Sequence, residues 1–147
     1  SISRRRMRAS ELKTLPPNCM FWDKDLCKYA TIEDVEKFVK IEPNTYGTDY
    51  EMRLQCFGRF RVLHYTGLND KNKRPIYEGH IVKAIYKISD KKYTIIGAIG
   101  FERAEFVLVD ASGNTASLSA FEPNELKIIG SIFSNPKLLE VKYGQAD

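Results

Sequence analysis

The sequence predicts a mainly β protein of the α+β class, built from small bent sheets, with one helix inserted near residues 31–41. Many short apolar runs are separated by turns rich in Gly, Pro, Asn and Asp, a pattern typical of small barrels and sandwiches. A single early stretch instead places its apolar residues at helical spacing. Gly97 and Gly100 interrupt a later apolar run, as expected where a sharply curved strand must kink.

The length of 147 residues predicts one domain. Residues 1–18 are expected to be a basic flexible arm, because they are Arg-rich and end in a Pro-Pro pair that resists helix and sheet. The domain then covers residues 19–147. Within it, residues 19–50 are expected to hold a hairpin and the helix, and residues 51–141 the β-rich core.

The first expected elements are a strand hairpin and a helix. Met20–Asp23 is an apolar strand candidate, and Cys27–Ala30 is expected to pair back with it across a polar turn. Thr31 is expected to cap the helix, since Glu33 and Asp34 follow in the first turn, where the helix dipole favours acidic residues.

The next segment, residues 50–65, is expected to be extended. Arg59 and Arg61 alternate with Phe60 and Val62, so the arginines should face solvent or a partner while the apolar pair faces the core. Arg53 belongs to a similar alternating run just before it and can share the arginine face.

The stretch from His64 to Lys83 is expected to form a structural hairpin or crossover. Tyr65 and Tyr77 would anchor its two ends in the core. Gly67 and Gly79 would supply backbone conformations that other residues resist. Further strands are expected at residues 81–88, 93–99, 106–109, 115–121 and 126–133, followed by a final turn or short helical piece at residues 137–141.

Several segments resemble the YopX family, which comprises small phage and prophage proteins. The matching segments are Phe21–Lys24 (Phe-Trp-Asp-Lys), Tyr65–Asn72, Ile76–Val82 and Ile129–Glu140, in the family's order and spacing. The resemblance implies structural roles for Trp22, Tyr65, Gly67, Tyr77, Glu78, Gly79, Gly130 and Pro136. It also implies a phage origin and a β-rich fold containing an SH3-like barrel, but no established reaction.

Two positions depart from the family pattern. His80 stands where an Asp usually follows Glu-Gly, which weakens any carboxylate pair with Glu78. Lys73 stands where a Gly commonly follows Asn, so the tip of the hairpin is expected to be a looser turn.

Composition excludes several classes of site. The three cysteines are odd in number and form no Cys-x-x-Cys motif, which argues against a disulfide framework or a zinc site and favours free thiols in a cytoplasm. With only two histidines, no metal or other cofactor is expected. No apolar run approaches a membrane span, so no membrane partner is expected, and the bacterial host cytoplasm is the expected location.

No nucleophile motif or phosphate-binding loop is present, so no enzymatic activity is expected. Asp70 and Glu78 fit turn formation better than catalysis. We therefore expect a non-catalytic phage accessory protein that acts as an oligomeric protein-interaction module. Its expected partner is a second copy of itself, through a strand edge or an aromatic surface, with another phage or host protein as an open possibility.

The alternative is a weak, sequence-nonspecific nucleic-acid-binding protein that uses a basic β face. The net charge of +4 permits this function without requiring it. The candidate contact residues for nucleic acid or a partner are Arg53, Arg59, Arg61, Lys71, Lys73 and Arg74. Tyr50, Tyr65 and Tyr77 are candidates for stacking on bases, and Lys91 and Lys92 form another basic loop. Burial of Arg59 and Arg61 at a subunit contact would favour assembly, whereas an open basic face would favour nucleic acid.

Overall fold

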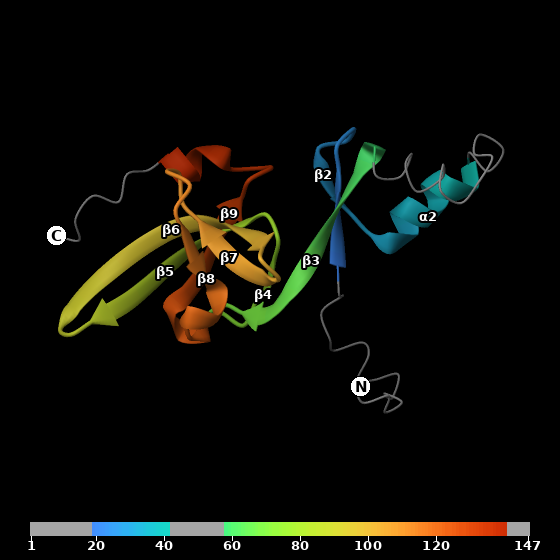
Figure 1. Cartoon of the computed structure of the whole chain (residues 1–147). Coiled ribbons are helices and arrows are strands. Elements are labelled where there is room, and N and C mark those ends of the chain that lie inside the picture. The colour runs from blue at the N-terminus through green and yellow to red at the C-terminus, as the bar shows by residue number, and fades with distance from the viewer. Residues whose placement is uncertain (1–18, 42–57, 141–147) are drawn as a thin grey trace, which may run out of the picture.

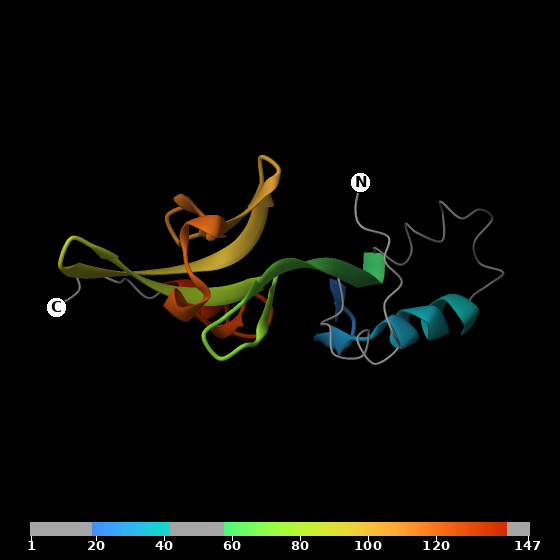
Figure 2. The same cartoon turned by 90° about the horizontal axis from the view of Figure 1, so that it is seen from below.

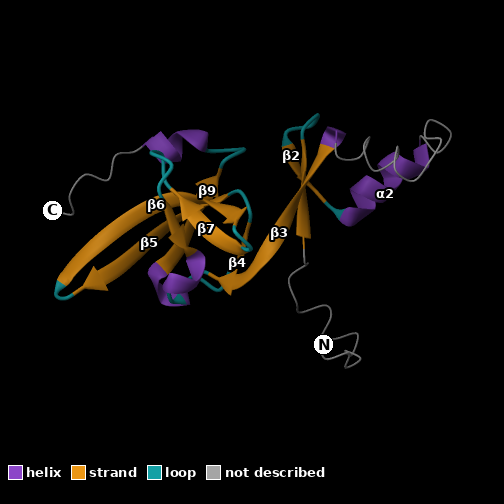
Figure 3. Cartoon of the chain, viewed as in Figure 1, coloured by secondary structure: helices purple, strands orange, loops and turns teal. Residues whose placement is uncertain are grey.

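The computed structural model describes residues 19–41 and 58–140. Within these ranges the chain forms nine strands, the helix α2 and three short 3-10 helices (Figure 1, Figure 3). The strands build two antiparallel sheets, ordered β2-β1-β3-β4 and β8-β7-β6-β5-β9. A mainly β fold with one inserted helix is therefore confirmed.

The first sheet contains β1 (Cys19–Asp23), β2 (Lys28–Ala30), β3 (Phe60–Asn69) and β4 (Pro75–Tyr77). The second contains β5 (His80–Ile88), β6 (Lys91–Glu102), β7 (Glu105–Val109), β8 (Thr115–Ser117) and β9 (Leu126–Ser131). The helices are α2 (Ile32–Ile41), η1 (Leu118–Ala120), η2 (Pro123–Glu125) and η3 (Pro136–Glu140). None of the helices in the described ranges has the length and apolarity needed to cross a lipid bilayer.

Helix α2 begins as its sequence predicts. The backbone N–H of Asp34 donates to Thr31 Oγ1 at 3.2 Å, and the backbone N–H of Thr31 donates to Asp34 Oδ2 at 2.9 Å. This reciprocal cap satisfies two N–H groups that the first turn would otherwise leave unpaired. The ring of Phe38 meets Phe60 edge-on at 5.6 Å, which packs the helix against the start of β3.

Strand β3 joins the two ends of the elongated molecule (Figure 2). Its first half pairs with β1, from Phe60 opposite Asp23 to His64 opposite Cys19. Its second half pairs instead with β4, where Tyr65 lies opposite Tyr77. One strand therefore contributes to both the N-terminal hairpin layer and the region beside the second sheet.

The second sheet curls around an apolar core, so the prediction of small bent sheets is confirmed (Figure 1). The core includes the fully buried side chains of Val82, Ala84 and Leu126. Strands β8 and β9 lie at the two edges, and in the described residues they do not pair with each other. The sheet is therefore an open half-barrel.

The strand expected over residues 115–121 is shorter than predicted. Strand β8 ends at Ser117, and Leu118 and Phe121 are both buried around the 3-10 turn η1. A 3-10 turn brings residues three apart to the same side, so it directs both side chains into the core, which an alternating strand would not do.

Candidate functional site

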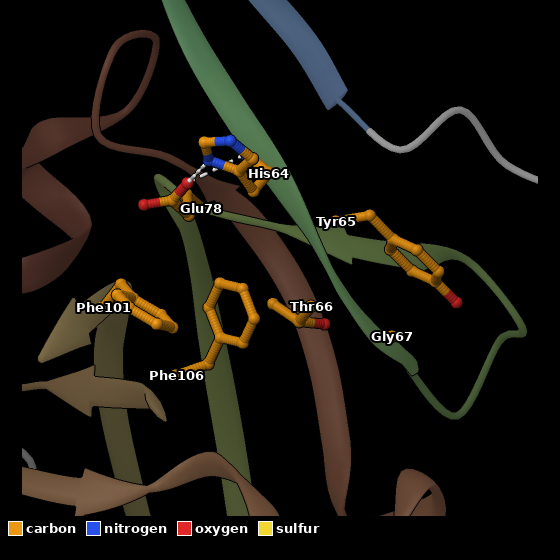
Figure 4. A pocket seen from close by; sticks show the side chains of 7 residues that line it. All are labelled: His64, Tyr65, Thr66, Gly67, Glu78, Phe101 and Phe106. Carbon is orange, nitrogen blue, oxygen red and sulfur yellow. Dashed lines mark hydrogen bonds and ion pairs between the residues drawn. The ribbon is translucent and has the colours of Figure 1, made fainter. Parts of the chain in front are cut away.

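A hollow lies between β3 and the closed end of the β6–β7 hairpin (Figure 4). Its volume is about 760 Å³. Phe101 and Phe106 form one wall, with their ring centroids 4.9 Å apart in an edge-to-face arrangement, and Phe101 is 54% exposed. Thr66 and Gly67 of β3 form the facing wall. Exposure of a large aromatic side chain in a hollow is typical of a binding surface.

A second hollow of about 480 Å³ adjoins the first, because Thr66 and Phe106 line both. Its apolar lining includes Leu68, Leu118 and Phe121. The two hollows lie side by side along β3, and we call them together the β3 groove.

The β3 groove is acidic. Glu78 lines the first hollow, and Glu105 and Glu122 line the second. No Lys or Arg side chain lines either hollow, although the whole chain carries a net charge of +4. The groove therefore differs in charge from the protein as a whole, and it favours a ligand with positive charge.

Glu78 is fixed in the groove by His64. One carboxylate oxygen, Oε1, accepts hydrogen bonds from the backbone N–H of His64 at 2.9 Å and from its ring Nδ1 at 2.6 Å. The backbone N–H of Glu78 donates in return to the His64 carbonyl at 3.0 Å. The Glu78 side chain is 18% exposed and that of His64 is 64% exposed. The pair therefore holds a carboxylate at the mouth of the groove.

A tight turn at residues 77–80 positions Glu78. Gly79 has a φ of 83°, and a Cβ there would lie 2.9 Å from the Phe133 ring, so both its backbone and its surroundings require glycine. The ring Nδ1 of His80 accepts the backbone N–H of Tyr77 at 3.0 Å. The unprotonated imidazole nitrogen therefore accepts the hydrogen bond that the carboxylate oxygen of an Asp would accept at this position.

Burial lowers the pKa of His80 below its usual value of 6.5, and the positive charge of Arg74 lowers it further, against an opposing effect of Asp70. Protonation would also remove the lone pair that holds the Tyr77 N–H. Below pH 6.5 His80 binds a proton in the unfolded chain but not yet in the folded chain. The contribution of neutral His80 to stability is therefore complete above pH 6.5, and it is lost as the pH falls through the lowered pKa.

We expect the wild-type free energy of unfolding to fall between about pH 7 and pH 5. We expect His80→Asp to remove most of this step, because a carboxylate oxygen accepts the Tyr77 N–H without a proton in that range. Urea unfolding of both proteins at a series of pH values measures the difference. Equal slopes for the two proteins would contradict this role for His80.

Two of the predicted contact residues, Arg59 and Arg74, are engaged within the fold. Arg53 and the stacking candidate Tyr50 lie outside the described residues. Arg59 is bound to the buried carboxylate of Asp23 through Nε at 3.1 Å and Nη2 at 3.0 Å. Arg61 is exposed, with its guanidinium 5.3 Å from the centre of the Phe133 ring. Arg59 therefore serves the fold rather than an open basic surface.

Arg74 is also engaged in the fold. Its Nη2 donates to the Ile128 carbonyl at 2.7 Å and lies 3.5 Å from Asp70 Oδ2. Lys71 and Lys73 remain exposed at the tip. Tyr77 is only 2% exposed, which rules it out as a stacking platform for a base, whereas Tyr65 is half-buried.

The tip of the β3–β4 hairpin spans five residues between the paired positions Asn69 and Pro75, and is therefore longer than the two-residue turn typical of Asn-Gly. Residues 70–74 and 110–114 share one backbone plan, in which the first N–H donates to the fifth carbonyl, at 2.8 Å and 3.0 Å. In both turns the leading aspartate accepts the N–H groups of the third and fifth residues. Lys73 and Gly113 occupy the fourth place with φ values of 64° and 84°. Lys73 thus adopts the left-handed conformation that glycine would take.

Several residues of the family motifs are buried, closely packed or placed at turns. Trp22 is 8% exposed and stacks on Phe133, with ring centroids 4.7 Å apart. A Cβ at Gly130 would lie 2.7 Å from Asn135 Oδ1 and 2.7 Å from Leu138 Cδ1, so only glycine fits without displacement. Pro136 opens η3, and Gly67 has a φ of 85° beside the groove. Within the described ranges, no three His, Cys, Asp or Glu side chains converge on a common point for a metal ion.

Sequence reasoning missed Phe101 and Phe106, the aromatic wall of the β3 groove. Each lies within an apolar strand pattern that is equally typical of core residues. The signal that could have identified them is their place beside the two-residue turn Arg103-Ala104, at the end of a hairpin, where strand ends project beyond the core.

Comparison with known proteins places the chain in a family. No curated protein matches it. The family model described as YopX protein matches residues 18–140, which is most of the 147 residues. The match includes every helix and strand of the two described ranges. The segments that carry the resemblance in the sequence all lie inside this match. The chain therefore belongs to the YopX family.

Proposed function

We propose that this YopX-family protein is a non-catalytic interaction module whose β3 groove binds a basic, apolar segment from a second copy of the chain. The observation that carries the proposal is the acidic, aromatic groove in a chain of net charge +4. An acidic site and a basic remainder on one molecule make copies of it complementary to each other.

The apolar part of the proposed contact depends on Phe101. Its side chain is 54% exposed in the free chain, and burial of an aromatic ring in an interface is a common source of binding energy. The carboxylates of Glu78 and Glu105 supply the charge complement. Because the groove and the basic segment are different surfaces, the contact is heterologous, and it builds a ring if it closes and a chain of copies if it does not.

Light scattering tests the proposal. We expect the wild-type mass to rise well above 16.9 kDa as the concentration increases. We expect Phe101→Ser and Glu105→Lys each to raise the concentration at which half of the protein is associated by about tenfold, which corresponds to about 1.4 kcal/mol.

The matched control is Leu26→Ser, because Leu26 is 57% exposed on the β1–β2 turn, away from the groove. This variant should associate like the wild type. A wild-type protein that stays monomeric at all concentrations would refute self-association. Association that Leu26→Ser weakens as much as Phe101→Ser would refute the groove as its site.

A further inference from the structure

The β5–β6 hairpin projects from the body of the protein. Both views show its two long strands extending beyond the curled part of the sheet (Figure 1, Figure 2). The strands pair without interruption from Ile81 opposite Ala98 to Ile88 opposite Lys91, where Ser89 and Asp90 close the turn. Beyond Ala84 the hairpin pairs with no third strand among the described residues, so its outer part is a two-stranded ribbon, of which Tyr86 and Ile95 still pack against the core.

One face of this ribbon carries aligned lysines. Lys87 lies directly opposite Lys92, and Lys83 lies directly opposite Lys127 on β9. Side chains alternate along a strand, so Lys83 and Lys87 point to the same face, together with their cross-strand partners. Lys87, Lys92 and Lys127 are exposed. We call these four residues the lysine face.

The lysine face is unfavourable for the protein alone. Like charges directly opposite each other on paired strands are destabilising. None of the ion pairs among the described residues includes Lys83, Lys87, Lys92 or Lys127. Their arrangement does not stabilise the sheet, and it suits a ligand that carries regularly placed negative charge.

Apolar side chains accompany the lysines. Ile85 lies between Lys83 and Lys87 on the same face and is 39% exposed. On the opposite face of the same ribbon, Ile88 beside the turn is 57% exposed and Tyr93 is 39% exposed. Exposed apolar side chains do not stabilise a hairpin that is surrounded only by water. A nucleic-acid groove offers both phosphates for the lysines and apolar base and sugar surface for these side chains.

We propose that the β5–β6 hairpin binds double-stranded DNA, with the lysine face against the phosphates. The major groove of B-form DNA is about 12 Å wide and admits a two-stranded β-ribbon, whereas the deep, narrow major groove of A-form RNA does not. The contacts are mainly to phosphate, so binding is weak, salt-dependent and independent of sequence. The basic surface therefore differs from the one expected around Arg59 and Lys71.

This site is independent of the β3 groove. Lys92 and Phe101 lie nine residues apart near opposite ends of β6, a separation of roughly 30 Å along an extended strand. Both sites can be occupied at once. Phe101→Ser should therefore weaken self-association and leave the affinity of each chain for DNA unchanged, so failure of one proposal does not imply failure of the other.

Fluorescence anisotropy with a short labelled DNA duplex tests the inference. We expect the wild type to bind at about 50 mM salt and to lose affinity steeply as salt is raised. Lys87→Glu should weaken binding by about tenfold or more and flatten the salt dependence. Its thermal midpoint should be equal to or above that of the wild type, because the new carboxylate faces Lys92. Lys87→Arg should retain binding.

The control is Lys71→Glu, which makes the same charge change at the exposed tip of the β3–β4 hairpin. It should alter affinity for the duplex by less than about threefold. Equal weakening by Lys71→Glu and Lys87→Glu would overturn the hairpin site, and so would a wild type that binds no duplex at low salt. Tighter binding to an RNA duplex or to single-stranded DNA would overturn the choice of double-stranded DNA.

Discussion

Asp70→Asn is expected to lower the free energy of unfolding by about 2–4 kcal/mol. The Asp70 side chain is fully buried, and its Oδ2 accepts the backbone N–H of Ile128 at 3.0 Å. In the variant, Oδ1 can still accept the two N–H groups of the turn. The amide NH₂ would then face the Ile128 N–H, leaving a buried donor without an acceptor and removing the negative charge beside Arg74.

The 110–114 turn supplies a matched control. Asp110 accepts the same two backbone N–H groups through Oδ1, but its Oδ2 meets only the side chain of Asn114, at 3.4 Å. We therefore expect Asp110→Asn to cost less than about 1 kcal/mol. Urea unfolding of both variants measures the difference. Similar losses in the two variants would show that the contact with β9 contributes nothing.

Acid should act on the same group. Burial raises the pKa of the Asp70 carboxyl, but hydrogen bonds from the N–H groups of Ile128, Arg74 and Asn72, together with the charge of Arg74, outweigh burial and leave the pKa below 3.8. A lowered carboxyl pKa contributes stability that is present above pH 3.8 and is lost as the pH falls through the folded value. Asp70→Asn should therefore reduce the loss of stability below pH 3.8. This window lies below the one assigned to His80.

Arg59→Ala is expected to lower the free energy of unfolding by about 2 kcal/mol. It leaves the Asp23 carboxylate buried without its cation, although the backbone N–H groups of Asp25 and Leu26 still donate to it. It also removes a guanidinium that lies 5.1 Å from the ring centres of both Phe38 and Phe60. The Arg59 side chain is 27% exposed, so solvent screening keeps the loss below that of a fully buried pair.

Two further variants isolate the cause. Arg59→Lys keeps the charge but cannot reproduce the two-point contact with Asp23, so we expect it to recover less than half of the loss. Arg61→Ala removes an exposed arginine two residues further along the chain and should cost less than about 1 kcal/mol. Thermal unfolding ranks the three variants. A loss for Arg61→Ala as large as that for Arg59→Ala would contradict the assignment of Asp23 as the decisive partner.

The features foreseen from the sequence depend on short-range patterns. The cap at Thr31 and the helix that follows were predicted because residues three apart determine them. The turn role of Asp70 was predicted for the same reason, since an aspartate bonds to the backbone two residues on. The left-handed conformation of Lys73 was not predicted, because lysine has no preference for it.

What could not be foreseen depends on residues that are distant in the sequence. The partner of Arg59 is 36 residues away, and the carbonyl bound by Arg74 is 54 residues away. Alternation assigned Arg59 to an open face, since it says which side of a strand a residue occupies and not what covers that side. The β3 groove and the lysine face likewise need the strand order, which brings Thr66 near Phe106 and Lys83 beside Lys127.

The bond between Asp70 and Ile128 also has a consequence for biosynthesis, because the two residues are 58 positions apart. As the chain leaves the ribosome, the β3–β4 turn emerges and can form its local bonds long before β9 exists. Until β9 arrives, the Asp70 carboxylate stays hydrated and one edge of β5 stays unpaired. Nascent chains that stall before Leu126 therefore leave this edge of β5 exposed, and completion of β9 covers it.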